Sequence, residues 1–150
     1  MFLTVHGAIG IIIGQRITSP WLAFILGFIF HYIFDIIPHG DTKFPKRYYN
    51  VIYASLAGII DLIVLAIFMI FIGTKVEILK INILLAITGS LVPDILQAVY
   101  FISRQKILGS LKKIHDFFHS LISKKIELGF ITGIIFQILL LILLTFIILI

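Results

Sequence analysis

The chain has 150 residues, of which 61% are hydrophobic and 13% are charged, whereas a soluble domain carries about 25% charged residues. This composition excludes an ordinary soluble domain and predicts a single membrane-embedded domain, residues 1–150. The chain has no cysteine, which excludes disulfides and thiolate metal sites, and we expect its net charge of +5 to set membrane topology rather than to bind nucleic acid.

Five apolar segments follow one another along the chain. They run from Phe2 to Ile13, Trp21 to Ile37, Val51 to Ile72, Ile81 to Ile102 and Leu128 to Ile150. A helix needs about 20 apolar residues to cross a bilayer, so the last three predict spanning helices and the second is adequate. The first is too short to cross easily, and we expect a partial or tilted helix paired with the second. Ser19 and Pro20 predict a tight connection between them, with the proline opening the second helix.

The stretch from Ser103 to Lys125 is basic but keeps apolar residues at helical spacing. These are Leu108, Leu111, Ile114, Phe118, Leu121 and Ile122. Their pattern predicts an amphipathic helix lying on or against the bundle. The expected fold is therefore an all-α integral membrane bundle of four to five transmembrane helices plus one interfacial amphipathic helix. Two G-x-x-x-G pairs, one at Gly10 and Gly14 and one at Gly129 and Gly133, predict close helix packing.

Lysines and arginines are distributed unevenly between the two sides of the expected bundle. Nine lie in loop 38–50 and stretch 103–125, which share one side, and the other side has Arg16, Lys75 and Lys80. The positive-inside rule therefore predicts an inner (plasma) membrane protein whose nine-residue side is cytoplasmic. No cleavable signal peptide is expected, because the first apolar run follows no basic region.

Most of the histidines and aspartates are expected at the cytoplasmic end of the helix bundle. The residues placed there are His6, His31, Asp35, His39, Asp41, Asp94, His115 and His119. Asp61 is expected deeper, about 15 Å from the start of its helix. Ionisable groups at membrane depth are costly unless they are paired or ligate a metal, and histidine with aspartate is a set that binds metals.

Three short motifs contain most of these residues, and the first and third of them put two side chains on one helical face. His31-x-x-x-Asp35 could chelate a metal, or it could be a hydrogen-bonded pair that only fixes packing. Pro38 then ends the helix, so that His39 and Asp41 can turn back toward the site.

The third motif, His115-x-x-x-His119, has the spacing of helical zinc pairs, and its alternative is an interfacial helix with histidines at the water boundary. Asp94 follows Pro93, which is expected to kink its helix beside a functional carboxylate. Asp61 and Asp41 are candidate catalytic residues, and each could be a general base, a metal ligand or a carboxylate that orients a ligand. The alternative for Asp61 is a protonated residue that only packs. His6 completes the candidate metal ligands.

The chain resembles the predicted membrane-bound, metal-dependent hydrolases of the YdjM type, which are thought to be distantly akin to zinc-dependent phospholipase C. The residues that carry the resemblance are His6, Pro93-Asp94, His115 to Ser120, and His31 with Asp35 and Pro38. Leu96 stands where the family usually has a second acid, and Asp116 where it usually has arginine. The resemblance implies hydrolase activity on a phosphoester.

We therefore expect a membrane-bound metal-dependent hydrolase of a phosphoester or lipid-like substrate, with zinc favoured over manganese or magnesium. Its expected partners are membrane lipid and a phospholipid or other phosphoester, and no nucleic acid. Two alternatives use the same residues: a transporter of divalent cations or protons, and a non-enzymatic membrane adaptor whose histidines are structural.

Overall fold

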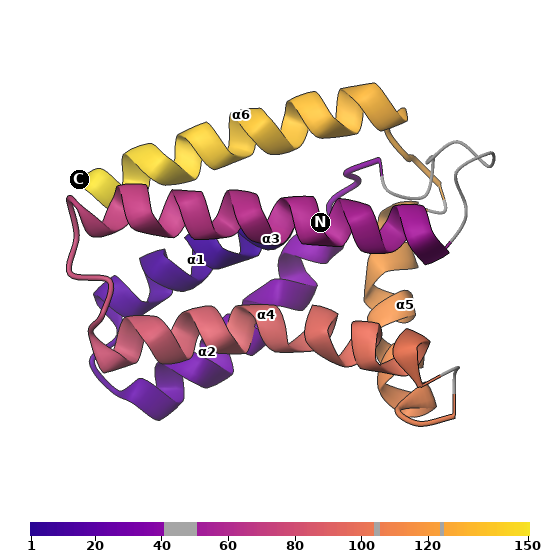
Figure 1. The fold of residues 1–150 in the computed structure, drawn as a ribbon, viewed down its shortest axis with the longest axis horizontal. Coiled ribbons are helices and arrows are strands. Elements are labelled where there is room, and N and C mark those ends of the chain that lie inside the picture. The colour runs from indigo at the N-terminus through magenta and orange to yellow at the C-terminus, as the bar shows by residue number, and fades with distance from the viewer. Residues whose placement is uncertain (41–50, 104–105, 124) are drawn as a thin grey trace.

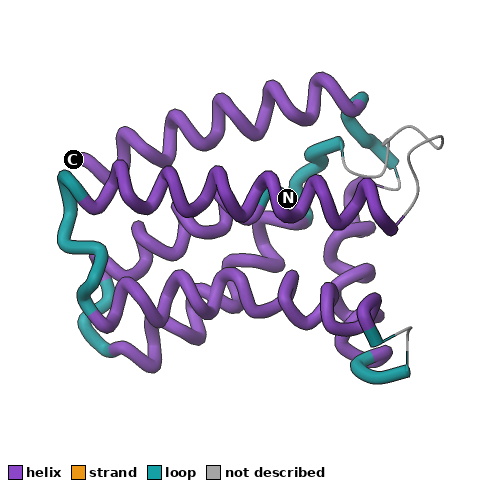
Figure 2. Tube along the Cα trace, viewed as in Figure 1, coloured by secondary structure: helices purple, strands orange, loops and turns teal. Residues whose placement is uncertain are grey.

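The computed structural model of the protein describes residues 1–40, 51–103, 106–123 and 125–150, and every regular element in those ranges is a helix (Figure 2). The helices are α1 (Leu3–Arg16), α2 (Pro20–Asp35), α3 (Val51–Gly73), α4 (Ile81–Ile102), α5 (Gly109–Ser123) and α6 (Phe130–Leu149). The expected all-α fold is confirmed. α2 begins as expected, because Ser19 accepts a hydrogen bond from the Leu22 N–H and Pro20 occupies the first turn.

Three helices are long and apolar enough to cross a membrane. Their apolar windows are Leu56–Gly73 in α3, Ile81–Ile102 in α4 and Phe130–Leu149 in α6, and α2 is a shorter apolar helix. Large apolar side chains cover their outer surfaces, among them Ile70 and Ile131, each 72% exposed. A surface of this kind is stable only against lipid, so the fold is that of a membrane-embedded bundle.

α1 is the central helix and reaches only part of the way along the bundle. Every residue from Thr4 to Ile11 is buried, and the helix contacts α2, α3, α4 and α6. Its 14 residues span about 21 Å, and its N-terminus lies near the middle of the long helices (Figure 1). The expectation of a short first helix packed on the second is confirmed.

Glycines bring the backbones of α1 and α2 against α4. A Cβ atom at Gly27 would lie 2.2 Å from the carbonyl oxygen of Ala86, and one at Gly89 would lie 2.1 Å from that of Phe24. Gly10 and Gly14 touch the α4 backbone in the same way, which confirms the packing expected of the first G-x-x-x-G pair. The close approach of α2 and α4 decides which of their polar side chains can meet.

α5 crosses one end of the bundle, beyond the N-terminus of α1 (Figure 1). It contacts α2 and α4 with one face, on which His115 is buried and Leu111 and Phe118 are half-buried. Ile114 and Leu121, which we expected on the packed face, remain 46% and 43% exposed, because they lie a quarter-turn or more away from His115 around the helix. The buried face of α5 covers the ends of α1 and α2, where the histidines gather.

Candidate metal centre

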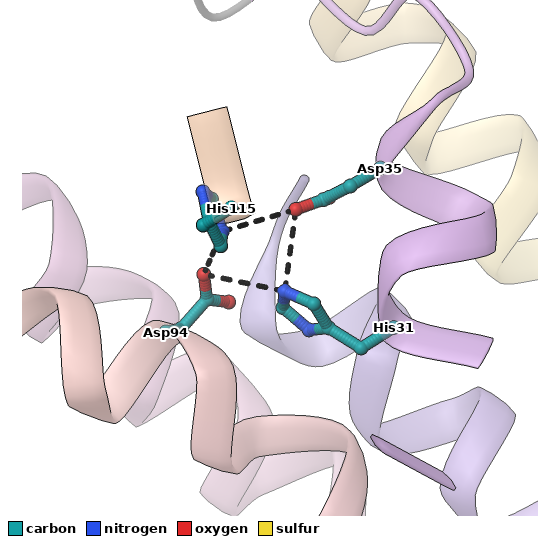
Figure 3. A group of neighbouring side chains, drawn as sticks. All are labelled: His31, Asp35, Asp94 and His115. Carbon is teal, nitrogen blue, oxygen red and sulfur yellow. Dashed lines mark ion pairs between the residues drawn. The ribbon is translucent and has the colours of Figure 1, made fainter. Parts of the chain in front are cut away.

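Four side chains from three helices converge under α5. His31 and Asp35 come from α2, Asp94 from α4 and His115 from α5, and each offers one ligand atom within 4.8 Å of the others (Figure 3). Asp94 lies about 12 Å before the end of α4, so the cluster is inside the bundle rather than at its rim. The His31 and Asp35 side chains are 0% and 1% exposed, and that of Asp94 is 22% exposed. This cluster could hold a metal ion.

Four nitrogen–oxygen distances within the cluster lie between 3.2 and 3.8 Å, which is close to the distance between neighbouring ligands of one metal ion. The Nε2 atom of His31 lies 3.2 Å from Oδ2 of Asp35 and 3.8 Å from Oδ1 of Asp94. The Nε2 atom of His115 lies 3.3 Å and 3.4 Å from the same two oxygens. Ligands about 2.0–2.1 Å from a tetrahedral ion are roughly 3.3 Å apart, whereas a charge-assisted hydrogen bond is shorter, about 2.7–2.9 Å. The geometry fits a shared ion better than direct pairs.

Three of the four donors also lack another partner. Nε2 of His31, Oδ2 of Asp35 and Nε2 of His115 are buried without a hydrogen bond to any described residue. A buried polar atom without a partner costs about 1–3 kcal/mol, and these three all face one point. Such a set of nitrogen and oxygen donors is the kind that zinc binds in proteins.

The ring of His31 is fixed by a backbone carbonyl of α4. Its Nδ1 lies 2.8 Å from the oxygen of Ser90, which can only accept, so Nδ1 carries the proton. With Nδ1 donating to Ser90, the Nε2 atom is the one that faces the cluster. Pro93 lies in the same turn of α4 and has no N–H to donate to the Gly89 carbonyl, which loosens the helical hydrogen bonding there.

Asp35 is held from behind by α1. Its Oδ1 atom lies 3.1 Å from Nε2 of His6 and 2.9 Å from the nitrogen of Met1, which leaves Oδ2 to face the cluster. The His6 ring also stacks on that of His31, with centroids 4.1 Å apart. His6, which we expected among the metal ligands, therefore lies on the side of the Asp35 carboxylate that faces away from the cluster.

His115 is the member of the cluster that α5 contributes. Burial disfavours its charged form, but the carboxylates of Asp35 and Asp94 outweigh burial and raise the pKa of His115 to about 9. At neutral pH without a metal the imidazolium is thus held by two carboxylates. A metal ion has to displace that proton in order to bind Nε2.

His39 and His119 form a separate pair beside the cluster. Their rings meet edge to face with centroids 4.7 Å apart, and the rings of His119 and His115 are 6.0 Å apart. Nδ1 of His39 donates to the Ile37 carbonyl, and the Nε2 group of Gln137 donates to the His39 carbonyl. The structure brings both histidines near the site, but not into the group of four.

Asp61, one of the two expected catalytic aspartates, is not in the cluster. Asp61 accepts hydrogen bonds from the N–H groups of Leu3 and Thr4 and from the Thr4 hydroxyl, so it caps the N-terminus of α1. Phe2, at the N-cap position, has no capping side chain of its own. Asp41 lies outside the described residues.

Several contributing residues were not identified from the sequence. Ser90 acts through its carbonyl, which any residue would supply, so the only signal was the nearby Pro93. Gln137 was visible as an isolated amide in an apolar helix; its Oε1 accepts from the Phe2 N–H, and its Nε2 holds His39. Gln97 was visible in the same way, and its Oε1 is buried without a partner among the described residues. A lone amide side chain in an apolar helix is therefore a signal of a buried polar group that needs a hydrogen-bond partner.

No protein-family description, curated protein or solved structure matches this chain.

Proposed function

We propose that this protein is a membrane-bound, metal-dependent hydrolase of the YdjM type that acts on a phosphoester or lipid-like substrate. One observation carries the proposal: two imidazole nitrogens and two carboxylate oxygens, drawn from three helices, lie within 4.8 Å of one another. We place the site on the cytoplasmic side of the inner membrane, because that side has nine of the twelve lysines and arginines.

In this proposal His31, Asp35, Asp94 and His115 hold the ion, and zinc is favoured by the mixture of nitrogen and oxygen donors. When bound, such an ion supplies a Lewis acid and an activated water for attack on a phosphoryl group. His31 keeps its Nε2 lone pair toward the site through Ser90. His6 keeps Oδ2 of Asp35 turned inward, so these two ligands are each oriented by a second group.

The surroundings of His115 support a phosphate-bearing substrate. Lys112 lines the same small cavity as His115, and its ammonium is paired with Asp116 at 2.5 Å. Phosphate oxygens could take the place of that exposed carboxylate. Ile95, which follows Asp94 in α4, and Ile114, which precedes His115 in α5, are 53% and 46% exposed, so the helices that carry the site present apolar surface to an approaching apolar tail.

The transporter alternative needs a polar path through the other half of the bundle. Between the cluster and the far end of α1 lie Ala8, Ile9 and Ile11, all buried and apolar, which favours a site with one opening. The adaptor alternative predicts no metal at all. Both alternatives remain outcomes of the experiment below.

The test is the metal content of the full chain purified in detergent, measured by elemental mass spectrometry. We expect near-stoichiometric zinc in the wild type and its loss in a His31→Ala/His115→Ala double variant. Asp116→Ala is the control, because that side chain is 53% exposed and paired with Lys112. The metal-loaded protein is then assayed against a panel of phosphomonoesters, phosphodiesters and phospholipid vesicles.

Three results would count against the proposal. Absence of metal after reconstitution would leave the histidines as structural contacts and favour the adaptor. Metal binding together with zinc uptake into proteoliposomes would identify a transporter. Metal binding with no hydrolysis of any phosphoester in the panel would reject the proposed substrate class.

A further inference from the structure

A small cavity lies on the outer side of His115, between α2, α4 and α5. It measures about 10 Å³ and is lined by the polar side chains of Tyr32, Gln97, Lys112 and His115 together with Pro93, Leu96 and Leu111. A volume of this size holds about one water molecule, and a bound water needs at least two polar partners. The polar part of the lining decides whether this cavity is wet.

Two buried polar atoms belong to the lining residues and have no partner among the described residues. They are Oε1 of Gln97 and Nδ1 of His115. Each would cost about 1–3 kcal/mol if it stayed without a hydrogen bond. The two atoms come from different helices, α4 and α5, and their residues share the one cavity.

The chemistry of the metal centre determines which of these atoms donates. Nε2 of His115 faces the carboxylates, so a neutral ring that binds a metal through Nε2 carries its proton on Nδ1. That N–H requires an acceptor, and histidines that bind metals usually have a carbonyl, a carboxylate or a water there. Lys112 cannot serve, because an ammonium has no acceptor and this one is paired with Asp116.

We infer that Gln97 is a positioning residue for His115 and acts through a single water in this cavity. The water accepts from the Nδ1–H of His115 and donates to Oε1 of Gln97. This bridge fixes the tautomer and the orientation of the ring from the side opposite the metal. The inference rests on the proposed metal centre and assigns α4 a second contribution to it, one turn after Asp94.

The test compares the zinc dissociation constants of full-length variants in detergent, measured by competition with a chromophoric chelator. Gln97→Met keeps the length of the side chain but removes the acceptor, and we expect zinc binding about 10- to 100-fold weaker. Gln97→Glu keeps an acceptor and should bind zinc as tightly as the wild type or more tightly. Gln15→Met is the matched control, because Gln15 donates to the Ile148 carbonyl near the C-terminal end of α1.

The thermal midpoints of the metal-free variants separate positioning from packing. The inference predicts that Gln97→Met and Gln97→Glu unfold within a few degrees of each other, although only the methionine variant loses affinity. Wild-type affinity in Gln97→Met would overturn the inference and leave the metal centre intact. Equal losses in both variants would overturn it too, since that pattern reports packing alone. Absence of zinc from the wild type would reject the metal centre and this inference together.

Discussion

His6 contacts the oxygen of Asp35 that points away from the cluster, with 3.1 Å between Nε2 and Oδ1. The other oxygen of the same carboxylate faces His31 and His115 at 3.2 Å and 3.3 Å. One carboxylate therefore connects the central helix α1 to the ligands from α2 and α5. Substitutions of Asp35 and of His6 should therefore have different effects on metal binding.

Substitution of His6 should weaken metal binding without abolishing it. His6→Ala removes the donor to Oδ1 of Asp35 and the ring that stacks on His31, so we expect zinc affinity to fall about 10- to 100-fold. The stoichiometry at saturating zinc should stay at the wild-type value. Complete loss of zinc at saturation would instead make His6 a direct ligand.

Asp35→Asn should abolish high-affinity binding, because the amide keeps the volume of the side chain but has no negative charge to offer the ion. We expect substoichiometric zinc after purification, measured by elemental mass spectrometry, and a fold preserved by circular dichroism. An asparagine variant that retains full zinc would remove Asp35 from the ligand set.

Asp61→Ala should lower stability and leave the metal in place. Asp61 accepts from the N–H groups of Leu3 and Thr4, and losing a helix N-cap costs about 0.5–2 kcal/mol. The thermal midpoint should fall by several degrees, while zinc stoichiometry below the transition stays at the wild-type value. Loss of zinc from the folded variant would restore Asp61 as a candidate site residue.

Gly89→Ala should damage the site from a distance. Its new Cβ would lie 2.1 Å from the Phe24 carbonyl oxygen, so α2 and α4 must separate, and with them His31 and Asp94. We expect a lower thermal midpoint and weaker zinc binding. The control is Gly58→Ala on α3, where nothing lies within 4 Å of the added atom. Equal effects of the two substitutions would show that helix spacing does not set the site.

Zinc affinity should rise with pH over the neutral range. The pKa of His115 is raised to about 9, so below that pH each ion that binds displaces one proton. Zinc affinity should therefore fall about tenfold for each unit by which the pH is lowered. The raised pKa of His115 also stabilises the metal-free folded state. This stabilisation is fully present below the ordinary histidine pKa of about 6.5 and is lost as the pH rises through about 9. Chelator competition between about pH 6.5 and 9 measures the first effect. A flat profile would mean that zinc does not bind Nε2 of His115.

The sequence determined the fold class and most of the chemistry in one region. Runs of about 20 apolar residues leave few alternatives to membrane helices, because backbone polar groups must be paired within each segment in lipid. Helical spacing placed Asp35 one turn after His31, and topology alone placed Asp94 and His115 at the same end of the bundle. A short α1 paired with α2 was also expected from its length, although its central position was not.

Only the tertiary structure decided which of the gathered residues meet. His6, His39 and His119 have the same residue type and the same expected depth as the clustered histidines, so the sequence could not separate them. Three tertiary contacts separate them. α1 begins in the middle of the bundle, where Asp61 caps it, and glycine contacts bring α2 against α4. The orientation of α5 about its own axis turns His115 toward the cluster. A helical pattern fixes neighbours three or four residues apart, but the approach of two helices depends on side chains and backbones far away in the sequence.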